Sequence, residues 1–304
     1  MKLRTLLSVM VISVATLNAQ TINLKIVNAQ TQEAIPYAAV FSKDNKEGSY
    51  ADEKGAFSFE FSATIDTILL STIGFQTLKM ALHDLREETR IALLPIKLDL
   101  PVVTITDAEF KREDIALGYF KRFRGIPTGS VATNANNRFA MLIQNSLEKK
   151  AWITKLRIRF DVDQRSLASY YRIRLRIYAN NEGKPGEDIL TSAQPIDIRG
   201  NQQSLEYAIP YGSISFPSEG IFIGYDVLGY KDETGNFHVF KSGQKVPKKK
   251  SGWYDFLCPS IAVWQKAKEK EVFEANGLGG WRKSPMLFRL GAPMFGIVAS
   301  FKAP

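Results

Sequence analysis

Apolar and polar residues alternate along much of this 304-residue chain. In residues 22–26 every second position is Ile or Leu, and in residues 57–61 every second position is Phe. Polar side chains stand between these apolar ones. This two-residue period is typical of β-strands with one buried face. Shorter apolar runs at 37–42 and 68–72 are separated by polar turn sequences. Several short strands at this spacing predict a small β-sandwich over residues 21–98.

Three sequence blocks in this region are AIPYAAV at 34–40, YADEKGAFSF at 50–59 and STIGFQT at 71–77. Asp52 and Gly55 can form the turn that precedes a strand, because Asp accepts local backbone hydrogen bonds and Gly tolerates positive φ. In order and spacing, the blocks resemble the carboxypeptidase regulatory-like domain, a transthyretin-like sandwich of seven strands. The resemblance implies a non-catalytic module, which often opens TonB-dependent receptors and other envelope proteins of Gram-negative bacteria.

Strand-like alternation returns in the rest of the chain, most regularly at 152–161 and 171–178. A larger, jelly-roll-like β-sandwich is therefore predicted for residues 126–304, so that the whole protein is all-β. Residues 99–125 are predicted to be a linker with a short helix. The stretch 260–275 fits either a short amphipathic helix or an irregular excursion from the sandwich.

The first 20 residues predict a secretory signal peptide. Lys2 and Arg4 precede an apolar run at 6–15, which is shorter than the roughly 20 residues that a membrane-spanning helix needs. Small residues that end at Ala19 supply a cleavage site. No later stretch is long and apolar enough to cross a bilayer, so we expect an exported protein of the periplasm or the outer-membrane surface.

The net charge of the chain is +9, and it falls to 9 − 2 = +7 without Lys2 and Arg4. This excess favours acidic partners, such as anionic glycans or lipid head groups. An exported protein rarely meets nucleic acid, so nucleic acid is not an expected partner. Cys258 is the only cysteine, which excludes an intramolecular disulfide.

The chain offers little for catalysis. It has two histidines, His83 and His238, one in each predicted domain, and no Gly-x-Ser-x-Gly sequence. Zinc usually requires several His or Cys ligands, which are scattered here. We therefore predict no catalytic residue, no metal and no cofactor. A glycosidase with paired carboxylates stays open as an alternative, because sequence spacing does not show how far apart two carboxylates lie.

Two rows of cations follow the apolar alternation of neighbouring predicted strands. The rows are Lys155, Arg157 and Arg159 on the first strand, and Arg172, Arg174 and Arg176 on the second. If both strands share a sheet with their apolar faces inward, six cations project outward together. Acids on a third strand could offset this repulsion. Alternatively, the face binds an anionic ligand, since the planar fork of Arg suits carboxylate and phosphate groups.

The long segment 241–286 contains a cluster of cations followed by Trp253 and Tyr254. Aromatic side chains beside cations on a loop can stack on sugars or pack the loop against its own domain. Long loops on rigid scaffolds often carry function. We therefore add Trp253 and Tyr254 to the arginines as candidate ligand-binding residues.

These observations predict a non-catalytic envelope protein, in which the first domain is a docking or spacing unit and the second binds a ligand. The ligand would be a glycan, an anionic envelope polymer or a protein partner. One alternative is a hydrolase on a sandwich scaffold. Another is an accessory subunit of an outer-membrane uptake complex.

Overall fold

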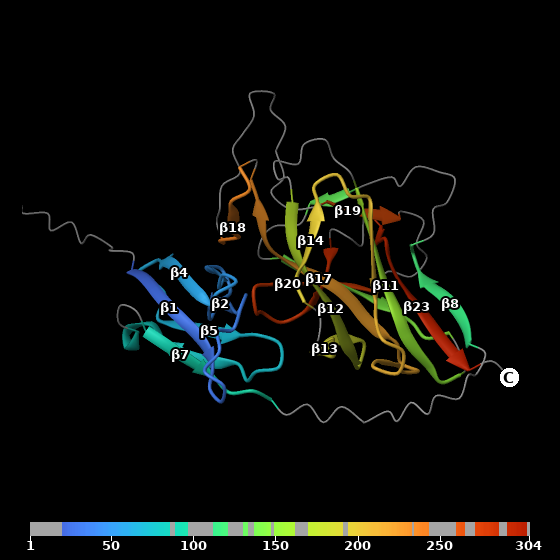
Figure 1. The fold of residues 1–304 in the computed structure, drawn as a ribbon, viewed down its shortest axis with the longest axis horizontal. Helices are drawn as coiled ribbons and strands as arrows, with labels where there is room; N and C mark the ends of the chain where they lie inside the picture. Colours follow the sequence, from blue (N-terminus) through green and yellow to red (C-terminus); the bar gives the residue numbers. More distant parts are fainter. Residues whose placement is uncertain are drawn as a thin grey trace, which may run out of the picture.

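The computed structural model describes residues 20–85, 89–96, 112–120, 130–132, 137–146, 149–161, 170–190, 194–232, 234–242, 260–264, 271–285 and 291–302. Within these ranges the chain folds into two β-sandwiches that lie side by side, the first in blue to teal and the second in green to red (Figure 1). The prediction of an all-β protein is confirmed. The predicted signal peptide lies outside the described residues except for Gln20, which begins the first strand.

The first sandwich contains seven strands, as predicted. One sheet has the order β4-β1-β7, where β1 is Gln20–Asn28, β4 is Ala56–Phe61 and β7 is Thr89–Leu93. The other has the order β3-β2-β5-β6, where β2 is Ala39–Ser42, β3 is Gly48–Tyr50, β5 is Thr67–Ser71 and β6 is Leu78–Ala81. A 3₁₀ turn, η1 (Leu82–Asp84), follows β6.

Alternation in the sequence decides which side chains of the first sandwich are buried. Along β4 the three Phe side chains are buried and the residues between them are exposed. They pack against Ile22, Leu24 and Ile26 of β1. The turn before β4 forms as predicted: the Asp52 carboxylate accepts the N–H groups of Lys54 and Ala56, both at 2.8 Å.

The second sandwich consists of two larger sheets. The first has the order β13-β12-β17-β10-β20-β21, with β14 beside β12 and β18 beside β17. Its strands are β10 (Asn137–Ile143), β12 (Tyr170–Asn181), β13 (Lys184–Asp188), β14 (Ile196–Arg199), β17 (Ile221–Lys231), β18 (Phe237–Val239), β20 (Val272–Asn276) and β21 (Arg282–Lys283).

The second sheet has the order β22-β19-β11-β23-β8, with β15 and β16 beside β11 and β9 beside β19. Its strands are β8 (Arg112–Gly118), β9 (Ser130–Ala132), β11 (Ala151–Asp161), β15 (Ser204–Ala208), β16 (Ser215–Phe216), β19 (Ser260–Trp264), β22 (Ala292–Pro293) and β23 (Phe295–Lys302). In Figure 1, β11, β23 and β8 lie at the end of the molecule away from the first sandwich.

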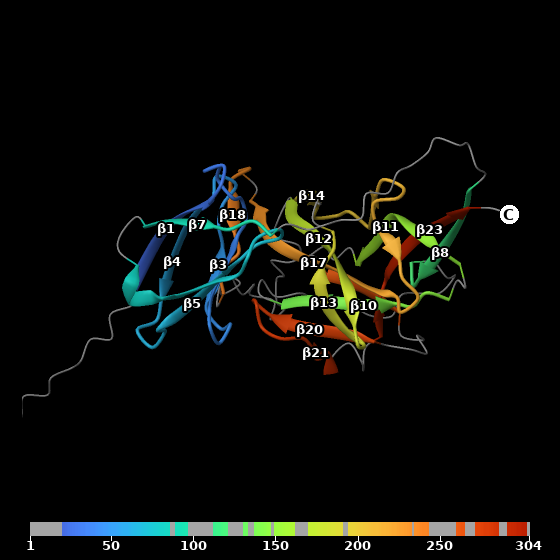
Figure 2. The same cartoon turned by 90° about the horizontal axis from the view of Figure 1, so that it is seen from below.

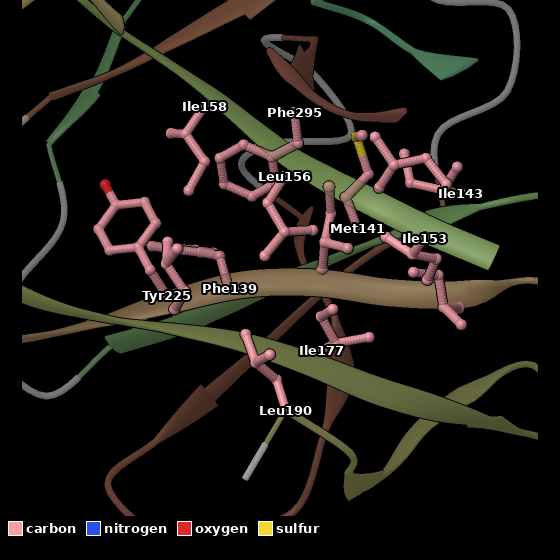
Figure 3. Close-up of a cluster of buried hydrophobic side chains, with 14 of the residues drawn as sticks. Phe139, Met141, Ile143, Ile153, Leu156, Ile158, Ile177, Leu190, Tyr225 and Phe295 are labelled. Atoms are coloured by element: carbon pink, nitrogen blue, oxygen red, sulfur yellow. The ribbon is translucent and has the colours of Figure 1, made fainter. Parts of the chain in front are cut away.

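Inward-facing side chains of both sheets form one core, part of which is shown in Figure 3. Met141 of β10, Ile177 of β12, Leu156 of β11 and Phe295 of β23 meet there, each no more than 2% exposed. Full burial of such a side chain contributes about 1.5–3 kcal/mol. The core therefore holds the outward faces of both sheets in fixed positions.

The linker prediction is wrong over residues 112–118, and the helix alternative for 260–275 does not form among the described residues. Residues 112–118, which we assigned to the linker, form β8 and pair with β23 along its whole length, because Ile115 and Leu117 pack on the core. Within 260–275, the described residues form β19 and most of β20 in place of a helix.

Candidate functional site

The two predicted rows of cations lie on different sheets, so the prediction of a single face with six cations is wrong. β12 belongs to the first sheet of the second sandwich and β11 to the second sheet. Both rows point away from the core, as the alternation indicated. The apolar residues that alternate with the cations on each strand are buried in the core. The two rows therefore lie on the outer faces of two different sheets of the second sandwich.

Arg176 on β12 is enclosed in a buried ion cluster. Its Nε atom donates to Asp226 Oδ2 at 2.7 Å, and its Nη2 atom contacts the same oxygen. Its Nη1 atom donates to Asp188 Oδ2 at 2.8 Å. Asp226, on the neighbouring strand β17, is 1% exposed. All three nitrogens of the guanidinium are thus bound to carboxylates within the protein, and Arg176 is buried.

Arg174 and Arg172 connect this cluster to the first sandwich. Arg174 Nη2 lies 3.7 Å from Asp226 Oδ2 and donates to the backbone oxygen of Tyr37 at 3.4 Å. Arg172 binds Asp197 through Nε at 2.6 Å and contacts the Tyr37 hydroxyl. Tyr37 has a φ of 54°, which non-glycine residues rarely adopt. The arginines of β12 therefore secure the junction between the sandwiches.

Burial and charge act against each other in this cluster. Burial alone would raise the pKa of Asp226, but Arg176 and Arg174 hold that pKa below its ordinary value. Burial, together with repulsion from Arg176, lowers the pKa of Arg174 to about 10. Since both values lie far from neutral pH, the cluster stays ionised under ordinary conditions.

The junction is completed by apolar contacts and backbone hydrogen bonds. Leu228 of β17 is fully buried in a cluster with side chains of the first sandwich, including Phe41 and Tyr50. Ser49 Oγ donates to the Phe240 backbone oxygen at 2.5 Å. Ser242 donates its N–H to the Gly48 oxygen at 2.8 Å. The edge of β3 is thereby covered by the chain that follows β18, which protects an otherwise open sheet edge.

A cleft of about 630 Å³ opens beside this junction. Ligand sites often occur between domains, but several polar groups in this cleft already have structural partners. Asp52, the one carboxylate of its described lining, holds the turn before β4. Ser49 is bound to Phe240. His238 stacks on Tyr230 and contacts Asp232 Oδ2 at 2.6 Å. The cleft therefore belongs to the junction between the two sandwiches.

The remaining candidates for chemistry are only partly described. His83 is an exposed residue beside Asp84, at 3.2 Å. Trp253, Tyr254 and Cys258 lie outside the described residues, so the two aromatic residues stay predictions. No group of three or more His, Cys, Asp or Glu side chains that could hold a metal occurs in the described part of the chain. Nor do the described residues include a helix long and apolar enough to cross a membrane.

The row on β11 differs from that on β12. Glu206, directly opposite on β15, binds Arg157 at 3.0 Å, so this one cation has an acid from a third strand. Lys155 and Arg159 have no ion pair with any residue that the structure describes. From Trp152 to Arg159, the outward positions of β11 extend over about 23 Å, at about 3.3 Å per residue.

Two further cations extend this row at the end where β11 begins. The guanidinium carbon of Arg112, on β8, lies 4.0 Å from the ring centre of Tyr211. Lys150 Nζ lies 5.4 Å from the ring of Trp152, and the Trp152 and Tyr211 rings are 6.2 Å apart. Stacking on a ring fixes a cation while its N–H groups stay free to bind an anion. Sequence reasoning missed these residues, which come from three distant segments.

We call this surface the basic face and define it by Arg112, Lys150, Trp152, Lys155, Arg157, Arg159 and Tyr211. Both Arg112 and Lys150 are exposed, and neither has an ion pair within the described ranges. Glu206 is bound to Arg157, whereas Asp114 accepts a hydrogen bond from Ser300. The cations thus outnumber the acids, which a surface that binds an anionic polymer requires.

Comparison with protein families identifies the first sandwich. Residues 23–105 match the family described as CarboxypepD_reg-like domain. The first sandwich is a CarboxypepD_reg-like domain. The resemblance predicted from the three sequence blocks is thereby confirmed, and the matched range extends past the predicted boundary at Leu98. No curated protein matches the chain.

Two solved structures have a weak likeness to the chain. A DUF3823 family protein from Bacteroides ovatus has a TM-score of 0.18 and 9% identity, and the match covers 73% of this chain and 98% of that one. A candidate carbohydrate-binding protein from Bacteroides uniformis has a TM-score of 0.20 and 9% identity, with coverage of 69% and 98%. At such TM-scores, neither likeness bears on the fold or the ligand of the second sandwich.

Proposed function

We propose that this chain is a non-catalytic, exported cell-envelope protein whose second sandwich binds an acidic glycan through the basic face. The observation that carries the proposal is a row of three cations on β11, of which only Arg157 has an acidic partner among the described residues, extended by two cations that stack on aromatic rings. The CarboxypepD_reg-like domain, firmly joined to the second sandwich by the Arg174–Asp226 cluster and Leu228, serves as the docking or spacing unit.

The chemistry of the basic face suits an elongated polyanion. The face is a row of separate cations along β11, extended by Lys150 and by Arg112 of β8. It therefore matches charges that repeat along a chain better than a single compact anion. Arg can bind a carboxylate through two parallel hydrogen bonds. The rings of Trp152 and Tyr211 offer apolar area next to these donors, on which the C–H face of a sugar can pack.

Binding of the purified full-length protein to an array of acidic and neutral glycans tests this proposal, at about 50 mM and about 500 mM NaCl. The screening length of solvent-exposed charges falls from more than about 10 Å at the lower salt to about 4 Å at the higher salt. We expect binding to uronic-acid or sulfated glycans that weakens at the higher salt. Binding restricted to neutral glycans, or binding to acidic glycans that does not depend on salt, would refute the role of the basic face.

A further inference from the structure

A second, smaller pocket lies on the opposite sheet of the second sandwich, at the hairpin between β12 and β13. It has a volume of about 370 Å³ and is lined by Asn181, Glu182, Lys184, Pro185 and Trp281. Figure 2 shows β13, β20 and β21 within the second sandwich, and Trp281 directly precedes β21. This volume falls within the range of about 300–1,000 Å³ that is usual for small-molecule sites.

The indole of Trp281 is held in one orientation. The ring of Tyr178, which is buried, meets it at 5.1 Å and an angle of 71°. Arg138, whose Nη2 atom donates to the Gly279 oxygen, places its guanidinium carbon 5.1 Å from the indole centre. Trp281 nevertheless keeps part of its surface exposed to solvent. A fixed and partly exposed indole is a suitable platform for a ligand ring, because little side-chain entropy is lost on binding.

The β12–β13 hairpin has a strained backbone at Glu182, whose side chain lines the pocket. Asn181 pairs with Lys184, so Glu182 and Gly183 are the two turn residues, with φ values of 51° and 80°. Turns with two positive φ values favour Asn, Asp or Gly at the first position. Glu182 occupies that position at a steric cost, and strain of this kind often marks functional sites.

The polar side chains around the pocket are not used by the fold. Among the described residues, Asn181, Glu182 and Lys184 make no side-chain hydrogen bond or ion pair. This distinguishes the pocket from the cleft at the junction, where Asp52, Ser49 and His238 have structural partners. Glu182 can only accept hydrogen bonds, Lys184 can only donate them, and Asn181 can do both.

We propose that this hairpin pocket binds a neutral pyranose ring, with its C–H face on Trp281 and its hydroxyl groups on Glu182, Lys184 and Asn181. A sugar hydroxyl both donates and accepts, so it matches a site that offers both kinds of group. A charged ligand would meet one side chain of the same sign. The site is separate from the basic face and does not depend on its ligand.

Saturation-transfer NMR on the full-length protein tests the inference. The probes are the methyl glycosides of glucose, mannose, galactose and N-acetylglucosamine, each at millimolar concentration. We expect saturation of the ring C–H protons of at least one probe. Trp281→Ala should abolish the signal, and Glu182→Gln should weaken the affinity at least about threefold, because a charged hydrogen-bond acceptor is lost.

Two controls separate this inference from other causes. Arg112→Glu/Lys150→Glu alters the basic face on the other sheet and should leave the sugar signal unchanged, whatever it does to acidic glycans. Should Trp281→Ala fail to fold, Glu182→Gln and Lys184→Met change only exposed side chains of the hairpin and give the same test. No saturation of any of the four probes, or saturation that these variants do not change, would overturn the proposal.

Discussion

Asp226 is predicted to be the most sensitive polar residue of the fold. Replacement by Asn removes the charge that two buried guanidinium groups share. Asp226 Oδ2 binds Arg176 Nε at 2.7 Å and lies 3.7 Å from Arg174 Nη2. The carboxylate is 1% exposed, and Arg174 and Arg176 are 5% and 8% exposed. Removal of one partner from such a buried pair costs about 3–5 kcal/mol. We expect a loss within this range, because Arg174 loses the carboxylate beside it while Arg176 keeps Asp188.

Urea unfolding, followed by far-UV circular dichroism, measures this cost by linear extrapolation. The matched control is Glu206→Gln, which removes one partner of an exposed ion pair. The Glu206 side chain is 47% exposed, and such pairs contribute about 0–1 kcal/mol. A loss below about 1 kcal/mol for Asp226→Asn, or equal losses in the two variants, would show that the cluster does not stabilise the fold as argued.

Four further changes have defined outcomes. Acid should destabilise the wild type more than it destabilises Asp226→Asn. The pKa of Asp226 is lower in the folded protein than in the unfolded chain, where it is about 3.9. The carboxylate therefore stabilises the fold above that unfolded pKa, and this stabilisation is lost as the pH falls through the folded pKa. Parallel pH slopes in urea titrations between about pH 5 and pH 2 would contradict this. Glu206→Gln frees Arg157 and should tighten binding of an acidic glycan severalfold in calorimetry; weaker binding would count against the basic face. Leu228→Ala should cost about 2–5 kcal/mol in urea unfolding, because Leu228 is fully buried between the sandwiches; a neutral result would mean that the junction is not a packed interface. Gly224→Ala should lower the melting temperature markedly, since its Cβ would lie 2.0 Å from the Phe139 oxygen; an unchanged melting temperature would disprove the close strand contact.

The sequence was sufficient to predict the strands of the first sandwich and its family. The three Phe residues of β4 alternate with polar residues, and the structure buries every one of them. Asp52 and Gly55 form the predicted turn. These features are local, so a single segment contains the whole signal. β8 was missed because it is an edge strand with only two partly buried apolar residues, Ile115 and Leu117, among polar ones.

The location of the candidate site was harder to predict, because it depends on residues far apart in the chain. An outward row of arginines has the same pattern whether it faces water, as on β11, or another domain, as on β12. Asp226, which neutralises Arg176, is 50 residues away in sequence. Arg112 and Tyr211 meet only after β8 and the chain beyond β15 are brought to the same sheet as β11. In this part of the basic face, only Lys150 and Trp152 are near each other in the sequence, two positions apart.

Charge reversal on the basic face tests the central claim most directly. The measurement is binding of the full-length protein to immobilised polygalacturonate at low salt, for the wild type, for Arg112→Glu/Lys150→Glu and for Lys54→Glu/Lys79→Glu. The last variant makes the same charge change on exposed lysines of the first sandwich. We predict that the first variant weakens binding by about tenfold or more, since loss of about 1.4 kcal/mol corresponds to tenfold, and that the second has a small effect. Equal affinities for all three proteins, or equal losses in both variants, would contradict a glycan site on the basic face.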